Sequence, residues 1–235
     1  MFRNSLLSCF ALVALSGILR ADPPKDRAEQ VKYARDRAKS SNNLKQIALA
    51  FHNHHDAFGT CPQDIVDKDG KPLLSWRVAI LPFIEQNQLN EEFKLDEPWN
   101  SDNNKKLLEK MPKTFAPVRG KAEKGMTFYQ SFAGDGAVMG TKKVRFADIT
   151  DGTSNTIAVI EAGEAVEWTK PSDIAYDAKK PLPKLGGLFD GDFNVAFCDG
   201  SVRFLKKGIK EETLKQFITI GGGEVVDVKD LEPAK

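Results

Sequence analysis

The sequence has few of the residues that most often bind metals or carry out catalysis. It contains three histidines and three cysteines in 235 residues. The histidines all lie between His52 and His55, directly before Asp56. On a helix, His52, His55 and Asp56 share one face, but no cysteine joins them and the sequence indicates no distant fourth ligand. We therefore interpret this stretch as a polar helix end, and we predict no metal and no cofactor.

The sequence also lacks an excess of charge of either sign. It has 34 basic and 33 acidic residues, which gives a net charge of +1. Arg3 and Arg20 lie in the first 21 residues, and without them the net charge is −1. Nucleic-acid binding requires a clustered basic surface, which this balance does not indicate. The total charge gives no reason to expect an anionic membrane surface as a partner either.

Only one long hydrophobic run is present, at residues 5–19. Arg3 precedes it and Ala21 offers a small residue for cleavage, which is the layout of a signal peptide over residues 1–21. The run is shorter than the roughly 20 apolar residues of a transmembrane helix. We expect a secreted or periplasmic protein with no stable transmembrane span after removal of the signal. The alternative is a protein tethered to the membrane by an uncleaved segment 5–19.

Cysteine is scarce in the rest of the chain. Cys9 lies within the predicted signal peptide, so Cys61 and Cys198 remain in the mature protein. Two cysteines in an exported protein could form one disulfide. Sequence spacing does not show whether their Cα atoms come within bridging distance, so two small buried thiols are the alternative.

The mature chain, residues 22–235, is consistent with a single α+β domain. Residues 26–58 have helical spacing, with a polar first half and an amphipathic second half, and predict a long spine helix. Residues 59–226 mix short helices, turns and strands in an α+β head, and residues 227–235 form a tail. Further expected elements are a helix that begins after Ser75 and is broken at Pro82, a helix over 101–111, strands over 126–132 and 156–161, a surface loop over 170–187 and a final helix over 210–220.

The clearest local pattern is a β-hairpin over residues 193–205. The dipeptide Asp199-Gly200 is typical of a two-residue turn. A two-residue turn makes Phe197 face Val202 across the hairpin. The apolar pairs then fall on one face of the ribbon, as a half-buried hairpin requires.

Two sets of side chains suggest catalysis, and neither forms a complete motif. Ser154 could act as a nucleophile, but it lies in no G-x-S-x-G turn, and the polar residues around it favour a structural loop. Glu161, Glu164 and Asp199 could supply a carboxylate pair for a hydrolase. Any chain of this length offers such pairs, so the hydrolase is kept only as an alternative function.

A binding function is the other alternative. Trp76, Trp99 and Trp168 could line a site for a small molecule or a glycan in a soluble extracytoplasmic binding module. Tryptophan is more often used for core packing, which is the competing interpretation.

Several stretches match one family in order: residues 40–59, 72–86, 96–108, 148–171 and 193–205. Together they resemble the domain-of-unknown-function 1559 family, which is abundant in planctomycete bacteria and is also catalogued as a solute-binding-protein family. The resemblance covers roughly residues 38–226. The residues that carry it are Asn43, Leu44, His52, His55, Asp56, Trp76, Asp151, Gly152, Ser154, Asn155, Glu161, Asp199 and Gly200.

The resemblance implies a pilin-like fold, with a long N-terminal helix packed on an antiparallel sheet. It links the chain to type II secretion pseudopilins and type IV pilins, and suggests other envelope or secretion-system proteins as partners. Two features depart from the family. Phe189 stands where many members have a histidine ten residues before Asp-Gly, and the prepilin cleavage motif is missing. We therefore expect an exported, non-enzymatic protein of the cell envelope that acts as a structural or interaction module.

Overall fold

The computed structural model describes residues 27–120, 122–134, 136–140, 142–223, 226 and 228–231. The predicted signal peptide and the hydrophobic run at 5–19 lie outside the described residues.

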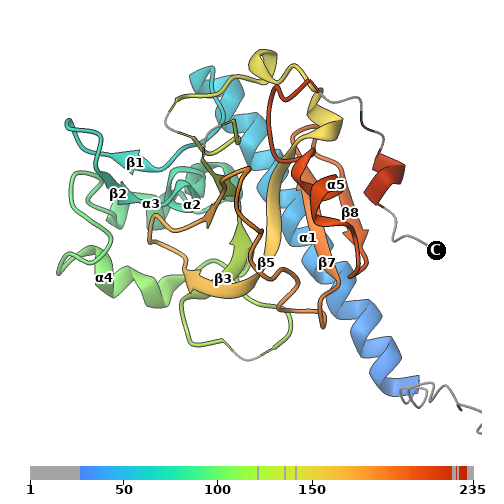
Figure 1. Ribbon diagram of the computed structural model, residues 1–235. Helices are drawn as coiled ribbons and strands as arrows, with labels where there is room; N and C mark the ends of the chain where they lie inside the picture. The colour runs from blue at the N-terminus through green and yellow to red at the C-terminus, as the bar shows by residue number, and fades with distance from the viewer. Residues whose placement is uncertain are drawn as a thin grey trace, which may run out of the picture.

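A long helix, α1 (Arg27–Phe58), forms the spine of the molecule. Its second half buries residues at helical spacing, among them Leu44, Ile47 and Phe51. Its first half is mostly exposed, and its N-terminal end extends beyond the rest of the body (Figure 1). The predicted spine helix over 26–58 is thus confirmed across the residues that are described, because the apolar stripe that thickens from Leu44 has a sheet to pack against.

That sheet has four antiparallel strands in the order β3-β5-β7-β8. The helix α1 lies against β5, β7 and β8 (Figure 1). The third strand in the order, β7, is buried along its whole length. The strands are β3 (Met126–Gln130), β5 (Ile157–Glu167), β7 (Phe193–Phe197) and β8 (Val202–Leu205).

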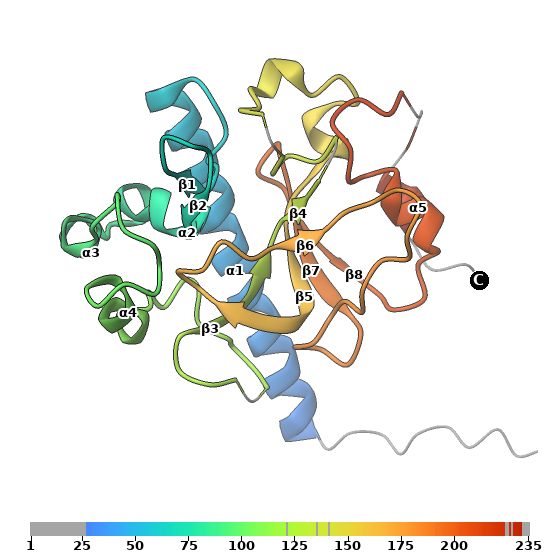
Figure 2. The same ribbon diagram turned by 60° about the vertical axis from the view of Figure 1, so that its left-hand side comes forward.

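Each face of the sheet supports a hydrophobic core. One core lies on the α1 side and includes Ile47 and Val159. The other core lies on the opposite face, where Val195 packs with residues from the C-terminal helix α5 (Glu211–Lys215) and the turn after it (Figure 2). Alternate residues of β7 therefore serve different cores, as the two-residue period of a strand requires.

A lobe of short elements packs beside the second half of α1 (Figure 2). The hydroxyl of Ser75 caps α2 by accepting a hydrogen bond from the Arg77 N–H at 3.2 Å, and Pro82 lies in the separate turn η1, as the sequence predicts. The elements are β1 (Ile65–Val66), β2 (Pro72–Leu74), α2 (Trp76–Ala79), η1 (Leu81–Ile84), α3 (Asn87–Glu92), α4 (Asn104–Leu107) and η2 (Leu108–Lys110).

The remaining elements connect the sheet to its coverings. Within the region predicted as a surface loop, a short strand pairs in parallel with the chain after β3. The elements are β4 (Phe132–Ala133), η3 (Phe146–Asp148), η4 (Thr153–Asn155), β6 (Ile174–Ala175) and η5 (Val228–Leu231). Among the described residues, no helix combines the length and hydrophobicity needed to cross a bilayer. The α+β class, with a long N-terminal helix packed on an antiparallel sheet, is confirmed.

The predicted hairpin is present, but its predicted register is wrong by one residue. Val202 pairs with Ala196 rather than with Phe197, because the loop contains three residues and not two. The Phe197 N–H donates to the Ser201 carbonyl at 2.9 Å, and Gly200 adopts φ +86°. A glycine with positive φ at the end of a three-residue loop is a common hairpin geometry, so Asp-Gly alone does not specify loop length.

Candidate functional site

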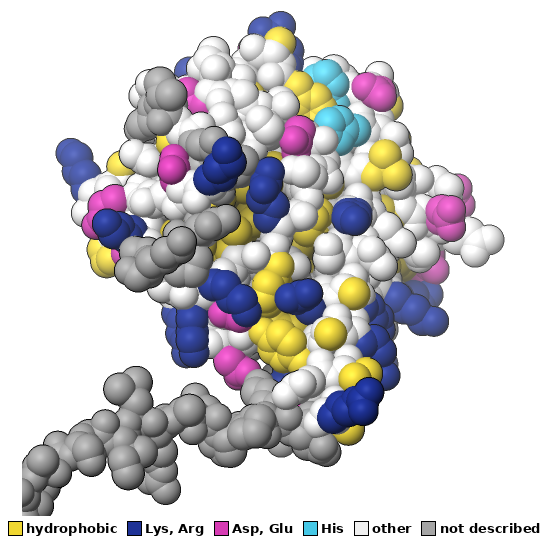
Figure 3. Space-filling view, turned by 90° about the vertical axis from the view of Figure 1, so that its right-hand side faces the viewer, with side chains coloured by type: hydrophobic (Ala, Val, Ile, Leu, Met, Phe, Trp, Pro, Cys, Tyr) yellow, Lys and Arg dark blue, Asp and Glu magenta, His cyan; other side chains and the backbone are white. Residues whose placement is uncertain are grey.

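Two of the three histidines pack around one aromatic ring at the C-terminal end of α1. The rings of His52 and His55 lie 4.6 and 4.4 Å from the ring of Phe146. The Nε2 atom of His55 also accepts a hydrogen bond from the Phe146 N–H at 3.4 Å. Histidine side chains are visible beside hydrophobic ones on the surface in Figure 3. Within the described part of the chain, no group of His, Cys, Asp or Glu side chains is arranged to bind a metal.

The loop that contains Ser154 meets the tip of the hairpin at the same end of the molecule. The Asp199 N–H donates to the Thr153 carbonyl at 3.0 Å, and the Cys198 N–H donates to the Thr156 carbonyl at 2.9 Å. A Cβ atom at Gly200 would lie 3.6 Å from Nε2 of His52. Three separate stretches of the family pattern, the end of α1, the loop 151–156 and the hairpin tip, are therefore brought together.

Asp151 ties the C-terminal glycines to this assembly. Its carboxylate accepts hydrogen bonds from the Gly222 N–H at 2.7 Å and the Gly223 N–H at 3.0 Å. Gly152 has φ +93°, and Asn155 donates from Nδ2 to the Asp151 carbonyl at 3.1 Å. The side chain of Ser154 is exposed. The loop thus holds backbone segments together, as its polar composition predicts.

Glu161 lies elsewhere, at the centre of the contact between α1 and the sheet. Its side chain is fully buried. The Ser40 hydroxyl donates to Oε1, the Asn194 backbone N–H donates to Oε2 at 2.6 Å, and the Asn194 side-chain amide donates to Oε1 at 3.1 Å. The hydroxyl of Tyr129 lies 2.7 Å from Oγ of Ser40 and accepts from Nδ2 of Asn43 at 3.1 Å. We call these five residues the Glu161 network.

Burial is the main cause of an unusual pKa in the Glu161 network. It raises the pKa of Glu161 from 4.5 to about 7, although the hydrogen bonds from Asn194 and Ser40 oppose the shift. Burial and the neighbouring Glu161 charge also raise the pKa of Tyr129. The carboxyl group therefore changes charge near neutral pH while it is shielded from solvent.

The three carboxylates of the hydrolase alternative are not brought together. Glu164 is exposed whereas Glu161 is fully buried, and the pairing of β5 with β3 is irregular between them. Asp199 is exposed at the hairpin tip, beyond Phe197, which pairs with Ile157 at the other end of β5. Ile157 and Glu161 are four residues apart in β5, which corresponds to about 13 Å along the strand. This distance exceeds the separation between the two catalytic carboxylates of a glycosidase.

The tryptophans do not line a common site. Trp76 and Trp168 are fully buried in the core on the α1 side, and Trp99 packs partly buried against that core. The indole N–H of Trp76 donates to Asp173 at 3.0 Å, and that of Trp168 donates to the Leu108 carbonyl at 3.0 Å. Core packing is therefore the correct interpretation of these residues.

Cys61 and Cys198 are both free and buried in the structure. Burial raises the pKa of the Cys61 thiol to about 12, and it raises the pKa of Cys198 as well. Both belong to the core on the α1 side. The structure shows them as two buried thiols, and a disulfide between them stays an open alternative.

An apolar groove lies beside the end of α1, with a volume of about 520 Å³. Phe58, Val66 and Leu95 line it, and they are three of the five large hydrophobic side chains that are exposed in the described structure. Asp64 and Lys143 supply charge at the groove. Burial and the nearby Asp173 raise the pKa of Asp64 to about 6. We call this feature the α1-end groove.

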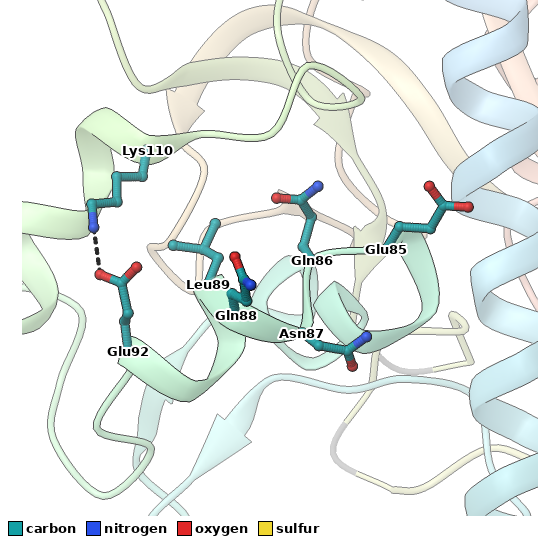
Figure 4. Close-up of a pocket in the computed structure, with 7 residues that line it drawn as sticks. All are labelled: Glu85, Gln86, Asn87, Gln88, Leu89, Glu92 and Lys110. Carbon is teal, nitrogen blue, oxygen red and sulfur yellow. Dashed lines mark hydrogen bonds and ion pairs between the residues drawn. The ribbon is translucent and has the colours of Figure 1, made fainter.

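A second hollow, between η1, α3 and η2, is a weaker candidate for a ligand site. Its lining is polar apart from Leu89, and Lys110 pairs with Glu92 across it (Figure 4). The side chains of Glu85, Gln86 and Asn87 point in different directions rather than toward a common centre (Figure 4). This hollow therefore lacks the convergent polar groups of a ligand site.

The comparison with protein families gave one result. A family described as a protein of unknown function, DUF1559, which also carries a bacterial solute-binding-protein label, matches residues 32–129 and 119–187. The chain belongs to this family. The DUF1559 match ends before the hairpin 193–205, so the C-terminal part of the expected resemblance lies outside it. The comparisons with curated proteins and with solved structures gave no match.

Two buried clusters in this DUF1559 chain were not predicted from its sequence. One is the Glu161 network, of which only Asn43 and Glu161 had been singled out. The other joins Arg77 to Asp173, which are 2.9 Å apart with almost fully buried side chains. Arg77 also donates to the Tyr129 carbonyl at 2.9 Å. The sequence signals for the first cluster are two polar residues, Glu161 and Asn194, each within an otherwise apolar stretch of strand.

Proposed function

We propose that the protein is an exported, non-enzymatic, pilin-like module of the cell envelope with a structural or interaction role. DUF1559 membership and the signal-like segment at 1–21 support this location. The long spine helix on an antiparallel sheet is the architecture that the pilin resemblance implies.

One observation carries the non-enzymatic part of the proposal. Polar family residues that are buried or half-buried form hydrogen bonds that hold separate segments of the chain together. Asp151 holds the C-terminal glycines, Asn155 closes its own loop and Glu161 fastens α1 to the sheet. Side chains whose hydrogen-bonding groups are used in this way contribute to a rigid module, whereas a catalytic site needs such groups directed at a substrate.

Cell fractionation with N-terminal sequencing tests the location. The expected product begins near Asp22 and is recovered outside the cytoplasm. A cytoplasmic product that retains Met1 would overturn the proposal.

Site-specific cross-linking in living cells tests the interaction role. A photo-reactive amino acid at Phe58, in the α1-end groove, is compared with one at the exposed Glu91 of α3. We expect cross-links to an identified envelope or secretion-system protein from Phe58 and none from Glu91. A protein that stays monomeric, with no cross-link from either position, contradicts the interaction role.

The α1-end groove favours a second candidate function, the binding of a small apolar molecule. Its volume of about 520 Å³ lies in the range of small-molecule sites. An environment-sensitive apolar dye is the probe. The variant V66D should weaken dye binding by about tenfold, since it places a charge among apolar contacts. The matched control is L49D, because Leu49 is also exposed but lies outside this groove; an equal effect of both variants would exclude the groove.

A further inference from the structure

The near-zero total charge conceals an uneven distribution along the chain. Residues 27–45 of α1 contain six basic and two acidic residues, a net charge of +4. Residues 85–110, in the lobe beside α1, contain four basic and seven acidic residues, a net charge of −3. The lobe lies on a different side of the molecule from the projecting end of α1 (Figure 2).

The basic residues of α1 are available to a partner. Lys32, Arg35 and Lys39 follow one another at helical spacing and are exposed, so they form a stripe along one side of the helix. Lys32 and Lys39 form no ion pair with another described residue. Arg35 lies 3.3 Å from the buried Asp36 but keeps 72% of its side chain exposed.

The head adds further cations on the other flank of α1, where Tyr33 and Arg37 lie. The guanidinium of Arg119 lies 5.2 Å from the ring of Tyr33 on α1. Arg37 and Lys206 both lie over the ring of Phe204, at 4.7 and 5.2 Å. Figure 3 shows Lys and Arg side chains gathered around the lower part of the molecule, where α1 leaves the body. We call Lys32, Arg35, Arg37, Lys39, Arg119 and Lys206 the basic stalk surface.

The acidic residues nearby leave a positive excess. Glu29 lies 4.0 Å from Arg119, and Asp192 pairs with Lys206 at 2.9 Å and is mostly buried. Asp36 is buried as well. The exposed Asp190 lies near Tyr33, so four acidic residues stand against the six basic ones. Lys32, Arg37 and Lys39 form no ion pair with any of them in the described structure, so the surface presents uncompensated positive charge.

We propose that the basic stalk surface binds the anionic headgroups of a phospholipid membrane. The apolar run at 5–19 precedes α1, and the intervening residues can span no more than roughly 25 Å. The membrane that holds that run during export, before cleavage, therefore lies within reach of the stalk. Val31, which is 63% exposed between the basic residues, can add apolar contact at the headgroup boundary. The inference rests on the proposed place of the protein in the cell envelope.

The experiment measures binding of the mature chain, residues 22–235, to phosphatidylcholine vesicles with and without phosphatidylglycerol. This chain lacks the hydrophobic run at 5–19, so the difference between the two vesicles reports the electrostatic part. Reversal of two charges in K32E/K39E should reduce the preference for anionic vesicles by about a hundredfold. The control K105E/K106E makes the same charge change at exposed positions of α4 and should leave the preference for anionic vesicles unchanged. High salt should remove the preference in wild type.

Three outcomes would overturn the proposal. The first is equal binding of wild type to both vesicles, and the second is an equal loss in K32E/K39E and K105E/K106E. The third is self-association in solution that K32E/K39E abolishes, because it would assign the surface to the acidic lobe of a second copy. Vesicle binding can fail while fractionation still finds the protein in the envelope, so this inference and the proposed function fail separately.

Discussion

The two faces of the four-stranded sheet are covered by different chemistry. The face toward α5 is apolar, and Phe193, Val195 and Phe197 all point into that core. The face toward α1 is apolar at the end of the helix near Phe51 but polar in the middle, where the Glu161 network joins α1, β3, β5 and β7.

This difference separates two contributions to the fold. Apolar burial on the α5 side has no directional requirement and does not depend on pH. The Glu161 network requires donors from three elements in one arrangement, and its central carboxyl titrates near neutral pH. The α5 side therefore contributes stability, whereas the α1 side fixes how the spine helix lies on the sheet and makes that contact pH-dependent.

The largest expected effect comes from a cavity on the apolar face. Phe197 is fully buried, and its ring lies 6.2 Å from that of Phe217. F197A should lower the free energy of unfolding by about 3–5 kcal/mol, by the same amount at low and high pH. Urea unfolding at about pH 5 and about pH 8 measures this. A loss that differs between the two pH values would show that the faces are coupled.

The second effect tests the polar face through its pH dependence. The folded pKa of Glu161 is raised from 4.5 to about 7, so the folded state holds this proton more tightly than the unfolded chain. The stabilising contribution is complete below pH 4.5 and is lost as pH rises through about 7. The loss should amount to about 3 kcal/mol.

The variant E161Q isolates this contribution, because it keeps the shape and cannot ionise. Asp64, whose pKa is raised to about 6, changes stability in the same direction in both proteins. The difference in unfolding free energy between wild type and E161Q should therefore vary with pH in the range where Glu161 titrates. If wild type and E161Q have parallel pH profiles, Glu161 does not titrate in the folded protein as proposed.

A smaller effect is expected from the loss of one hydrogen bond in the Glu161 network. S40A removes the hydroxyl that donates to Glu161 and lies beside Tyr129, which should cost about 1–2 kcal/mol. The Ser40 hydrogen bond lowers the pKa of Glu161, so its removal should move the pH-dependent loss to higher pH. S41A is the matched control, since Ser41 is the adjacent helix residue and lies outside the network. An identical pH profile in S40A and S41A would contradict the role of Ser40.

The sequence predicts elements more reliably than the way they pair. The helix over 26–58 was predictable, because its apolar spacing is local. The final helix was predicted over 210–220 but ends at Lys215. Beyond it, the Phe217 carbonyl accepts from the Ile157 N–H at 2.8 Å, and the Ile220 N–H donates to the Gly136 carbonyl at 2.7 Å. These long-range bonds compete with helix formation, and local spacing does not reveal them.

The same limit applies to the candidate site. The structural role of the loop at 151–156 follows from its composition, which suits hydrogen bonds within a turn. The Glu161 network does not follow, because it depends on the register of three strands and on one face of α1. The sequence allows a catalytic carboxylate at Glu161, but its side chain is buried and accepts hydrogen bonds from Ser40 and Asn194, so it connects α1 to the sheet.

The smallest expected effect concerns the nucleophile that the loop could have supplied. Ser154 is exposed and forms no hydrogen bond through its side chain to another described residue. S154A should therefore change the unfolding free energy by less than about 0.5 kcal/mol. It should also leave unchanged any hydrolysis of a general ester substrate by the purified protein. Wild-type hydrolysis that S154A abolishes would contradict the proposed non-enzymatic role, because it would show that Ser154 acts as a nucleophile.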